Sequence, residues 1–522
     1  MRNLVRRDEA RAADAYARGL WVSTTLVDAL ADAARDTPDR ALVIDGGITL
    51  TAGELQDRAT ALALQLTEWM PTGSVVSFML PNWHEAAIIY LGATLAGMAV
   101  NPILPSLRDR ELCFILDDAQ SRAIFIPAEF GGHDYAAMLT RVVSQLATPP
   151  EVVVLRGDPG PHHAFDSMPA APDRELPTLN PDDIRMIMYT SGTTGRPKGV
   201  LHSHNSINAL IRQLRDHWMI DPGDTFLVPS PIAHIGGSIY AFECPLLLGS
   251  TAVLMQRWNA EDGVALMTEH RCTHMAGATP FLEQLLGAAE RSGTRLPDLK
   301  VFICGGASVP PSLIRRASGY FDRAVVSRVY GSTEVPVTTV GSLTPGGVEH
   351  AAETDGRPGI AEIRLVSGEI RAQGPQMLLG YLHPDDEIES FDENGFFRTG
   401  DLGRWVDGDY LQVTGRAKDL IIRNGENISP KEVEDLLVGQ LGIVEAAVVG
   451  LPDERTGERA CAVLVTTDGR RPGVTDLGRL LAEHGLARFK APERVEIWDA
   501  LPKNDAGKVL KHQIRATLKG HD

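Results

Sequence analysis

The sequence predicts an α/β protein in which a large N-terminal domain of α/β layers precedes a small α+β C-terminal domain. The chain has 522 residues, whereas one hydrophobic core seldom supports more than about 250–300, so at least two structural units are expected. The first third alternates strand-like and helix-like segments, which is typical of parallel α/β architecture. Beyond about residue 415 the segments become shorter and follow an α+β pattern.

The first elements are a hairpin and a capped helix. ALVI and ITL flank Gly46-Gly47, and two strand-like segments around such a pair predict a tight turn. Thr51 and Glu54 then have the spacing of a capping box, so a helix should begin there. Its buried face is predicted from apolar residues at helical spacing, namely Leu55, Ala59 and Leu62.

An uncharged run from Ala86 to Leu107 raises the question of a membrane span. Asn101, Pro102 and Pro105 interrupt the run, and its small residues at helical spacing suit a helix that packs on a sheet. We therefore predict a buried helix followed by a short extended segment around AVNPI, and no membrane span. The neighbouring segments keep the alternation, with a strand at SVVSFML, a helix over 109–117 and a strand at RAIFI.

The middle of the chain contains a proline-rich connector and a glycine-rich loop. Residues 157–183 carry six prolines and no sustained periodicity, which predicts a surface connector within the large domain. The strand MIMY, the loop and an amphipathic helix follow. Asn205 or Ser206 is the predicted cap of that helix. Its apolar face comprises Ile207, Leu210, Ile211 and Leu214.

The small domain is predicted to begin near Arg416 to Asp419. DLII leads to an Asn424-Gly425 turn, and the segment that starts at Ser429 has proline at the first helical position, where proline is favoured. Strands EAAVVG and ACAVLV, a helix over 476–483, the strand RVEIW and a final helix complete the domain. The predicted division is 1–415 for the large domain, 416–418 for a hinge and 419–522 for the small domain.

Charge and cysteine content disfavour several functions. The formal net charge is −18, which opposes non-specific binding to nucleic acid or anionic lipid, so a polyanionic ligand needs a local basic patch. The five cysteines are scattered and form no CxxC pair. Buried thiols in a reducing cytoplasm fit this pattern better than disulfides or a sulfur-bound metal. The N-terminal segment lacks the apolar core of a signal peptide, so export is not expected.

The stretch MIMYTSGTTGRPKGV, residues 186–200, has the composition of a phosphate-binding loop. Glycines let backbone amides converge on an anion, hydroxyl groups add donors, and lysine adds charge. The Walker pattern requires glycine immediately before the lysine. Here Pro197 precedes Lys198 and Gly199 follows it, so a Walker-type kinase or hydrolase is not expected.

This loop resembles the phosphate-binding signature of the adenylate-forming superfamily, which includes acyl-CoA synthetases, peptide-synthetase adenylation domains and luciferases. The resemblance implies that the large domain has parallel-rich sheets with a β-barrel-like part and that the small domain is mobile. It also implies that the loop binds the phosphates of ATP. The loop residues so assigned are Thr190, Ser191, Gly192, Thr193, Thr194, Gly195 and Lys198.

Two further segments resemble nucleotide signatures of the same superfamily. CGGASVP contains Gly305, Gly306 and Ala307 and resembles the segment that lines the adenine and acyl pockets. YGSTE, residues 330–334, resembles the next signature, in which the tyrosine stacks on adenine, the threonine bonds the α-phosphate and the glutamate binds Mg²⁺. By itself this pentad is a common turn sequence, and its place after the loop makes it specific. Its residues are Tyr330, Gly331, Ser332, Thr333 and Glu334.

The remaining motifs concern the ribose and the small domain. Asp401 in TGD resembles the ribose clamp, in which a carboxylate accepts from both ribose hydroxyls; an ordinary Asp-turn is the alternative. Arg416 is implied as a second ribose or phosphate contact and Lys418 as the hinge, with a surface turn as the alternative. Lys508 in LPKNDAGKVLK resembles the lysine that enters the active site from the small domain. It is our main catalytic candidate, although its turn alone predicts a solvated lysine.

SPIAHIGGSIYAF, residues 230–242, resembles one wall of the acyl pocket. His234 is implied as a ring near the reacting carboxylate, where it packs or gates rather than acting as an acid or base. No acid occurs between His234 and Phe242, whereas amino-acid activators usually place an aspartate there, so a neutral hydrophobic acid is predicted. The expected acyl-pocket residues are His234, Gly236, Gly237, Phe281 and Gly306.

The resemblance also implies that a second face of the small domain, used for thioester formation, binds CoA. Gly425 and Glu426 in IIRNGENIS resemble the segment beside the pantetheine tunnel, and a plain Asn-Gly hairpin is compatible with that role. Lys490 in RFKAPE is one of several basic residues that are candidates for the CoA phosphates.

The sequence therefore predicts a cytoplasmic acid–thiol ligase that uses ATP, Mg²⁺ and CoA to form acyl-AMP and then acyl-CoA. Medium-chain fatty, alicyclic and aromatic acids all remain candidate substrates. The predicted acyl wall resembles most the one in cyclohexanecarboxylate and medium-chain ligases. The alternatives are an enzyme that loads a carrier protein's phosphopantetheine arm, a nucleotide sensor without catalysis and a luciferase-like oxygenase. A homodimer is left open, and nucleic acid is not an expected partner.

Overall fold

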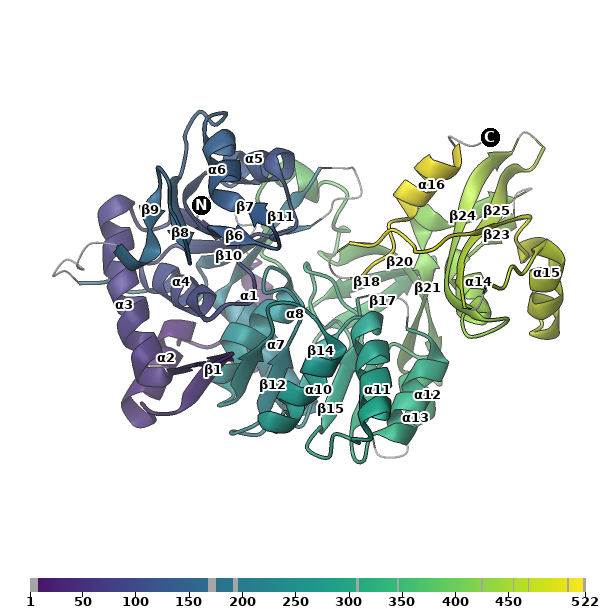
Figure 1. Cartoon of the computed structure of the whole chain (residues 1–522), viewed down its shortest axis with the longest axis horizontal. Helices are drawn as coiled ribbons and strands as arrows, with labels where there is room; N and C mark the ends of the chain where they lie inside the picture. Colours follow the sequence, from purple (N-terminus) through teal and green to yellow (C-terminus); the bar gives the residue numbers. More distant parts are fainter. Residues whose placement is uncertain are drawn as a thin grey trace.

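Two large β-sheets form most of the N-terminal domain of the computed structural model, and a smaller sheet forms the C-terminal domain, on the right of Figure 1. This confirms the predicted combination of a large α/β domain with a small α+β domain. The structure describes residues 8–167, 175–190, 196–306, 309–344, 347–423, 426–453, 455–467, 469–504 and 507–519.

The first sheet has seven strands in the order β16-β15-β14-β12-β13-β1-β2. Its neighbours are parallel except for the β1–β2 hairpin, whose predicted tight turn contains Gly46 with φ +55°. The strands are β1 (Ala41–Asp45), β2 (Ile48–Thr51), β12 (Thr225–Val228), β13 (Thr251–Leu254), β14 (His274–Gly277), β15 (Val301–Cys304) and β16 (Val325–Arg328).

The second sheet has eight strands in the order β19-β11-β10-β4-β3-β5-β8-β9. The β10–β11 and β11–β19 pairs are antiparallel, and the other pairs are parallel. The predicted connector 157–183 is not wholly loop, because β9 pairs with the open edge of β8. The strands are β3 (Val75–Phe78), β4 (Ala99–Pro102), β5 (Ser121–Pro127), β8 (Glu151–Leu155), β9 (His163–Ala164), β10 (Ile184–Thr190), β11 (Lys198–Ser203) and β19 (Gly380–Tyr381).

Helix α4 (His84–Leu95) lies in the main core, which takes residues from both large sheets. Almost all of its residues are buried, which explains why the helix and β4 carry no polar face. Next to it, α3 (Ala52–Trp69) begins at the predicted capping box, where Thr51 N donates to Glu54 Oε2 over 3.0 Å. No helix among the described residues is long and apolar enough to cross a membrane.

The cap predicted for α7 (His204–His217) was placed too late. Ser203 is the N-cap, and Ser206 closes a capping box three residues on. Strand β11 runs directly to Ser203 without an intervening turn, so the helix starts one residue after the strand. Asn205 lies inside the helix, where its Oδ1 accepts from the Val22 amide over 2.8 Å.

The other helices of the large domain cover the sheets. They are α1 (Glu9–Ala17), α2 (Leu26–Asp36), α5 (Asp109–Asp118), α6 (Tyr135–Val143), α10 (Ala260–Glu269), α11 (Thr279–Ser292), α12 (Pro311–Tyr320) and α13 (Val348–Glu353). The two-residue strands β6 (Glu129–Phe130) and β7 (His133–Asp134) form a separate hairpin.

A third sheet leads from the large domain toward the small one. Its antiparallel strands are paired in the linear order β17-β18-β20-β21, and among the described strands no pairing closes it into a barrel. The sheet ends at Arg416, and the next strand begins at Ile421, so the predicted hinge stays a prediction for the short segment between them. The strands are β17 (Glu362–Val366), β18 (Glu369–Gln373), β20 (Phe397–Val406) and β21 (Tyr410–Arg416).

The small domain has five paired strands, β23-β22-β25-β24 with β26 beside β25. Its first helix has Pro430 at the predicted position, while the predicted turn residues 424 and 425 lie outside the described residues. The elements are β22 (Ile421–Arg423), β23 (Glu426–Ile428), α14 (Pro430–Leu437), β24 (Ile443–Asp453), β25 (Gly457–Thr466), α15 (Val474–Glu483), β26 (Arg494–Ile497) and α16 (Lys511–Lys519).

Candidate active site

The glycine-rich loop connects two adjacent antiparallel strands, β10 and β11. Thr190 and Lys198 face each other across this pair, so both ends of the loop are fixed by the eight-stranded sheet. Seven predicted site residues lie outside the described residues, namely Ser191, Gly192, Thr193, Thr194, Gly195, Ala307 and Gly425.

The two cations at the end of the loop are held by a carboxylate that the sequence reasoning missed. Arg196 Nη2 lies 2.8 Å from both oxygens of Asp386, and Lys198 Nζ lies 3.7 Å from Asp386 Oδ1. Asp386 belongs to the short helix η4 (Pro384–Glu387), and its side chain is 9% exposed. Asp386 therefore positions the two cations beside the loop.

Tyr330, Asp401 and Arg416 meet in one hydrogen-bonded group. Tyr330 Oη donates to Asp401 Oδ2 over 2.7 Å, and Arg416 Nε donates to Asp401 Oδ1 over 2.7 Å. Asp401 and Arg416 are paired residues of the β20–β21 ladder. Burial, and next the charge of Asp401, raise the pKa of Tyr330, so its hydroxyl stays a donor. Each carboxylate oxygen keeps a lone pair for another donor such as a ribose hydroxyl.

The backbone of residues 331–334 is held from several sides. A Cβ on Gly331 would lie 2.6 Å from Val337 N, so this position requires glycine. His202 Nε2 lies 2.8 Å from the Thr333 carbonyl oxygen, and burial lowers the pKa of His202 to about 4. His202 is therefore neutral at physiological pH and donates to that carbonyl. Ser332 Oγ accepts from the Val335 amide over 3.2 Å.

Glu334 is suited to Mg²⁺ by its chemistry and its surroundings. Its Oε1 accepts from Tyr381 Oη over 3.0 Å, and the residue is only partly buried. The described interactions leave room for further ligands on this carboxylate, and Mg²⁺ prefers such oxygen ligands, usually one or two carboxylates together with substrate phosphates. The residue present therefore fits the predicted metal role.

Lys508 of the small domain lies close enough to Asp401 and Arg416 to interact with them electrostatically. The residue as a whole is exposed, but protein atoms lie around its ammonium group. This desolvation lowers the pKa of Lys508 to about 8, and the positive charge of Arg416 acts in the same direction. Figure 1 shows the C-terminal segment, in yellow, extending from the small domain toward the large one.

The turn before Lys508 rests on helix α11 of the large domain. A Cβ on Gly507, which has φ +77°, would lie 3.3 Å from Pro280 Cγ. Asn504 Oδ1 accepts from the Lys508 amide over 2.8 Å and shapes the turn. The predicted hinge residue Lys418 lies in the short helix η5 (Ala417–Asp419), where desolvation, and next Arg416, lower its pKa.

Comparison with known proteins decides the family. The family model for AMP-binding enzymes matches residues 30–382, and the model for the AMP-binding enzyme C-terminal domain matches residues 432–508. The chain belongs to the AMP-binding enzyme family. The second match ends at Lys508, so the AMP-binding family models cover both the loop and this lysine.

Relatives of this AMP-binding enzyme cover nearly its whole length. The medium-chain fatty-acid–CoA ligase of Escherichia coli (strain K12) is 32% identical over 98% of this chain and 93% of the relative. The sulfoacetate–CoA ligase of Cupriavidus necator is 31% identical over 94% and 98%. The crystal structure of ATP-bound MatB from Rhodopseudomonas palustris is 26% identical, covers 95% and 99%, and has a TM-score of 0.84.

The predicted acyl wall of this AMP-binding enzyme forms one continuous but irregular helical segment. His234 is the N-cap of α8 (Ile235–Ser238), which continues as a π-helix, η3 (Ile239–Glu243), and as α9 (Cys244–Leu247). Pro245 cannot donate to the carbonyl four residues earlier, and its ring would clash there. These two effects account for the wide π turn, in which Cys244 N donates to the Ile239 carbonyl.

Close backbone packing fixes the beginning of this wall. A Cβ on Gly237 would lie 2.2 Å from the Pro231 carbonyl oxygen, so only glycine fits. Asn82, which the sequence reasoning missed, donates to the Ser230 carbonyl over 2.9 Å and accepts from the Ile232 amide over 3.1 Å. The wall is therefore anchored to the loop after β3.

The other predicted acyl-pocket residues, Gly236, Gly306 and Phe281, have different surroundings. Cβ atoms on Gly236 and Gly306 would meet no atom within 4 Å, whereas one on Gly305 would lie 2.9 Å from the Val329 carbonyl oxygen. Phe281 packs on Gly277 and edge-on against Trp258, with a centroid separation of 5.1 Å. These contacts place Phe281, on α11, beside the end of β14 and the segment before α10, so its part in the pocket stays a prediction.

Of the three residues considered for CoA, Glu426 and Lys490 are among the described residues, and both lie on the small domain. Glu426 begins β23 and is exposed. Lys490 Nζ lies 2.6 Å from Glu432 Oε2, so a carboxylate of its own domain already neutralises it. This pairing weakens the case for Lys490 as a phosphate contact.

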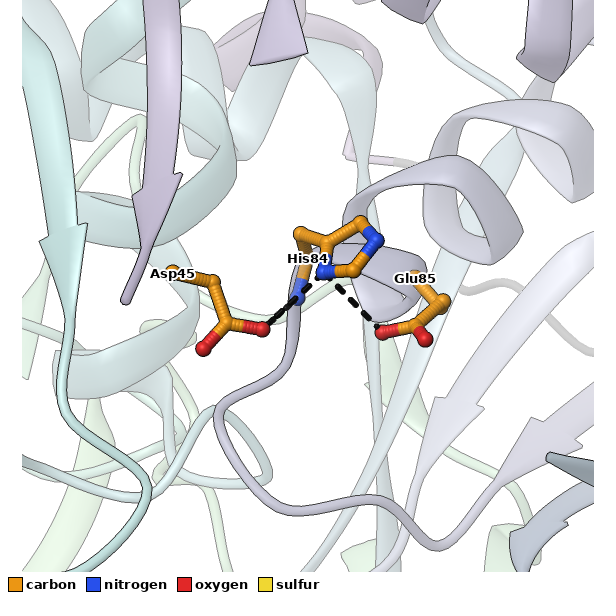
Figure 2. Close-up of side chains that lie close together, drawn as sticks. All are labelled: Asp45, His84 and Glu85. Atoms are coloured by element: carbon orange, nitrogen blue, oxygen red, sulfur yellow. Dashed lines mark hydrogen bonds and ion pairs between the residues drawn. The ribbon is translucent and has the colours of Figure 1, made fainter. Parts of the chain in front are cut away.

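Asp45, His84 and Glu85 offer the single group of three metal-ligating side chains found among the described residues, with ligand atoms within 4.8 Å of one another. Figure 2 shows His84 Nδ1 between the two carboxylates. Arg156 Nη2 lies 2.8 Å from Asp45 Oδ2 and 2.7 Å from Glu85 Oε2. Because this guanidinium is ion-paired with both acids and lies beside the His84 ring, the group is an ion-pair network and no second metal site is inferred.

Proposed function

We propose that this AMP-forming acid–CoA ligase activates a neutral, hydrophobic carboxylic acid in two steps. In the first step, a carboxylate oxygen attacks the α-phosphorus of ATP. The new O–P bond replaces the bond to pyrophosphate, which leaves, and acyl-AMP remains. In the second step, the thiol of CoA attacks the acyl carbon, AMP leaves with the bond electrons, and the thiol proton passes to solvent.

The observation that carries this proposal is the docking of the Gly507 turn on Pro280 of the large domain, which brings Lys508 within electrostatic range of Asp401 and Arg416. An acid, a triphosphate and a crowded phosphorus centre must approach one another, so positive groups are needed to offset their repulsion. In this proposal Lys508 bridges the carboxylate and the α-phosphate, and Lys198 holds the outer phosphates. Thr333 donates to the α-phosphate, Tyr330 stacks on adenine, and Asp401 binds the ribose.

In this proposal Glu334 is the residue of the chain that binds magnesium. This carboxylate would hold Mg²⁺ together with the phosphates, and the ion would supply charge neutralisation at the departing pyrophosphate. The residues of the chain supply the remaining positive groups at the loop and at Lys508.

A neutral acyl pocket is proposed because the one acid at the end of the wall is occupied. Glu243 lies 2.8 Å from Arg185 and accepts from Tyr90 Oη over 2.5 Å, and the Arg185 and Glu243 side chains are each 1% exposed. The preceding π-helical residues are apolar and buried. This wall therefore offers no carboxylate to an amino-acid ammonium. Relatives that act on acids as different as fatty acids and sulfoacetate leave the substrate to be decided by such contacts.

CoA is proposed as the acceptor, with Gly425 and Glu426 beside its thiol arm. A carrier protein's phosphopantetheine arm carries the same thiol and is the alternative acceptor. The two cases differ in whether free CoA suffices for product formation.

A substrate panel tests the proposal. With ATP, Mg²⁺ and CoA, cyclohexanecarboxylate, octanoate or benzoate is expected to release pyrophosphate and form acyl-CoA, whereas phenylalanine and sulfoacetate should give at least about tenfold less, because a charged group would lose its hydration in an apolar pocket. Pyrophosphate release and mass spectrometry of the thioester provide the measurement. Adenylate without acyl-CoA, restored by a carrier protein, would favour the alternative acceptor. Preference for an amino acid would overturn the neutral pocket.

The pH dependence of adenylation should report on Lys508. Its pKa is lowered to about 8, and the protonated form is the one that offsets negative charge. The kcat/KM for ATP should therefore fall as the pH rises through about 8, since kcat/KM follows the free enzyme. Lys508→Arg stays charged over this range and should lose the alkaline decline, even if its rate is lower throughout. A decline retained in that variant would assign the titration to another group.

A further inference from the structure

Tyr381 contacts two parts of the proposed ATP site at once. Its Oη donates to Glu334 Oε1 over 3.0 Å, and Lys198 Nζ lies 5.0 Å from the centre of its ring. The residue is 2% exposed. A cation at this distance over an aromatic face is attracted by the ring. One side chain thus contacts both the carboxylate assigned to the metal and the ammonium assigned to the phosphates.

The backbone of Tyr381 is fixed independently of these two contacts. Tyr381 pairs with Val200 in the β11–β19 ladder, and its amide donates to Glu387 Oε1 over 3.0 Å. Since the strand position does not depend on the hydroxyl, removal of that group should leave the fold intact.

We propose that Tyr381 is a positioning residue that aims the Glu334 carboxylate and the Lys198 ammonium at the same metal–ATP complex. The hydroxyl occupies one site on Oε1 and so restricts rotation of the carboxylate, which leaves its remaining lone pairs in a fixed direction. The ring draws the ammonium to the same side. This inference rests on the proposed function in taking ATP and a divalent cation as the ligands of Glu334 and Lys198.

The alternative is that the Tyr381 hydroxyl only stabilises the fold. Tyr381 belongs to a cluster of buried side chains that includes Val200, Val335 and Phe397, and loss of a buried hydrogen bond can lower stability without touching function. The two roles differ in a quantity that stability does not control, namely the affinity for the metal in the presence of nucleotide.

The test is Tyr381→Phe, which keeps the ring over Lys198 and removes only the hydroxyl. Electron paramagnetic resonance measures the binding of Mn²⁺ to the full chain with ATP and without any acid. This binding is expected to weaken about 5- to 10-fold, as for the loss of one typical hydrogen bond. ATP binding without metal should change by less than about twofold, because the ring and Lys198 remain.

A matched control loses a hydroxyl in the same domain. Tyr320 Oη lies 3.0 and 3.1 Å from the carbonyl oxygens of Ala289 and Thr294, which share its single proton, so Tyr320→Phe removes a comparable hydrogen bond. It should change the melting temperature but not the affinity for Mn²⁺. Tyr381→Leu removes the ring as well and should weaken ATP binding without metal.

Unchanged Mn²⁺ affinity in Tyr381→Phe would overturn the inference, as would an equal loss in Tyr320→Phe. Failure of the proposed function looks different. In that case no acid releases pyrophosphate from the unmodified enzyme, while the binding comparison between the two variants can still be made and still supports or contradicts the role of Tyr381.

Discussion

Replacing Lys508 by alanine is expected to lower acid-dependent pyrophosphate release by about 10²–10³-fold, the cost typical of removing one preorganised donor from a site of developing negative charge. Thioester formation from supplied acyl-AMP and CoA should fall by less than about threefold, because the phosphorus chemistry is then complete. The reason is geometric: the turn at Gly507 docks on Pro280 of the large domain and carries the lysine to Asp401 and Arg416.

Lys503→Ala is the matched control for this prediction. Lys503 lies five residues away, but its Nζ pairs with Glu445 of the small domain over 2.7 Å. Its loss should leave both half-reactions nearly unchanged. Pyrophosphate release and thioester formation are measured separately with the same enzyme preparations. If Lys508→Ala lost both half-reactions equally, the lysine would serve domain stability or docking rather than adenylation.

Local sequence patterns were sufficient for most elements of the fold. The capping box at Thr51 is visible from two residues that are three positions apart. The uniformly apolar sequence of α4 likewise predicts a helix that is buried on all sides. Two details of the fold were predicted wrongly because they depend on neighbouring elements rather than on local sequence. Strand β9 has only two residues and exists because β8 offers it an edge. The cap of α7 is displaced to Ser203 because the preceding strand ends there.

The residues of the candidate active site were also predicted only in part. The ordered motifs predicted Tyr330, Asp401 and Arg416, which the structure brings into direct contact. Tyr381 and Asp386 were missed because their partners lie 47 and 190 residues away in the chain. Such contacts depend on the register of β11 with β19, which no local pattern reveals. The available signal was a tyrosine followed shortly by the run of acids Asp385 to Glu387.

Asp401→Ala is expected to weaken ATP binding about 100-fold. A carboxylate that accepts from two ribose hydroxyls makes two hydrogen bonds to a charged group, and the loss of both, at about 1.5–3 kcal/mol each, readily exceeds the ~2.7 kcal/mol that a hundredfold change requires. The variant would also leave Arg416 without its 2.7 Å partner and Tyr330 without its acceptor. Isothermal titration with ATP in the absence of any acid provides the measurement.

The same substitution should shift the pH profile. Asp401 raises the pKa of Lys508, whereas Arg416 lowers it. Removal of the Asp401 carboxylate leaves Asp419 to oppose the lowering influences of burial, Arg416 and Lys418, so the pKa should fall further. The alkaline decline in adenylation should therefore move below the pH of about 8 expected for the unmodified enzyme. Asp407→Ala is the control, since Asp407 lies on the same hairpin with a side chain that is 70% exposed. A weaker affinity for ATP without any movement of the decline would mean that Asp401 binds ribose but does not set the charge of Lys508, and the proposed electrostatic link between the two domains would fail.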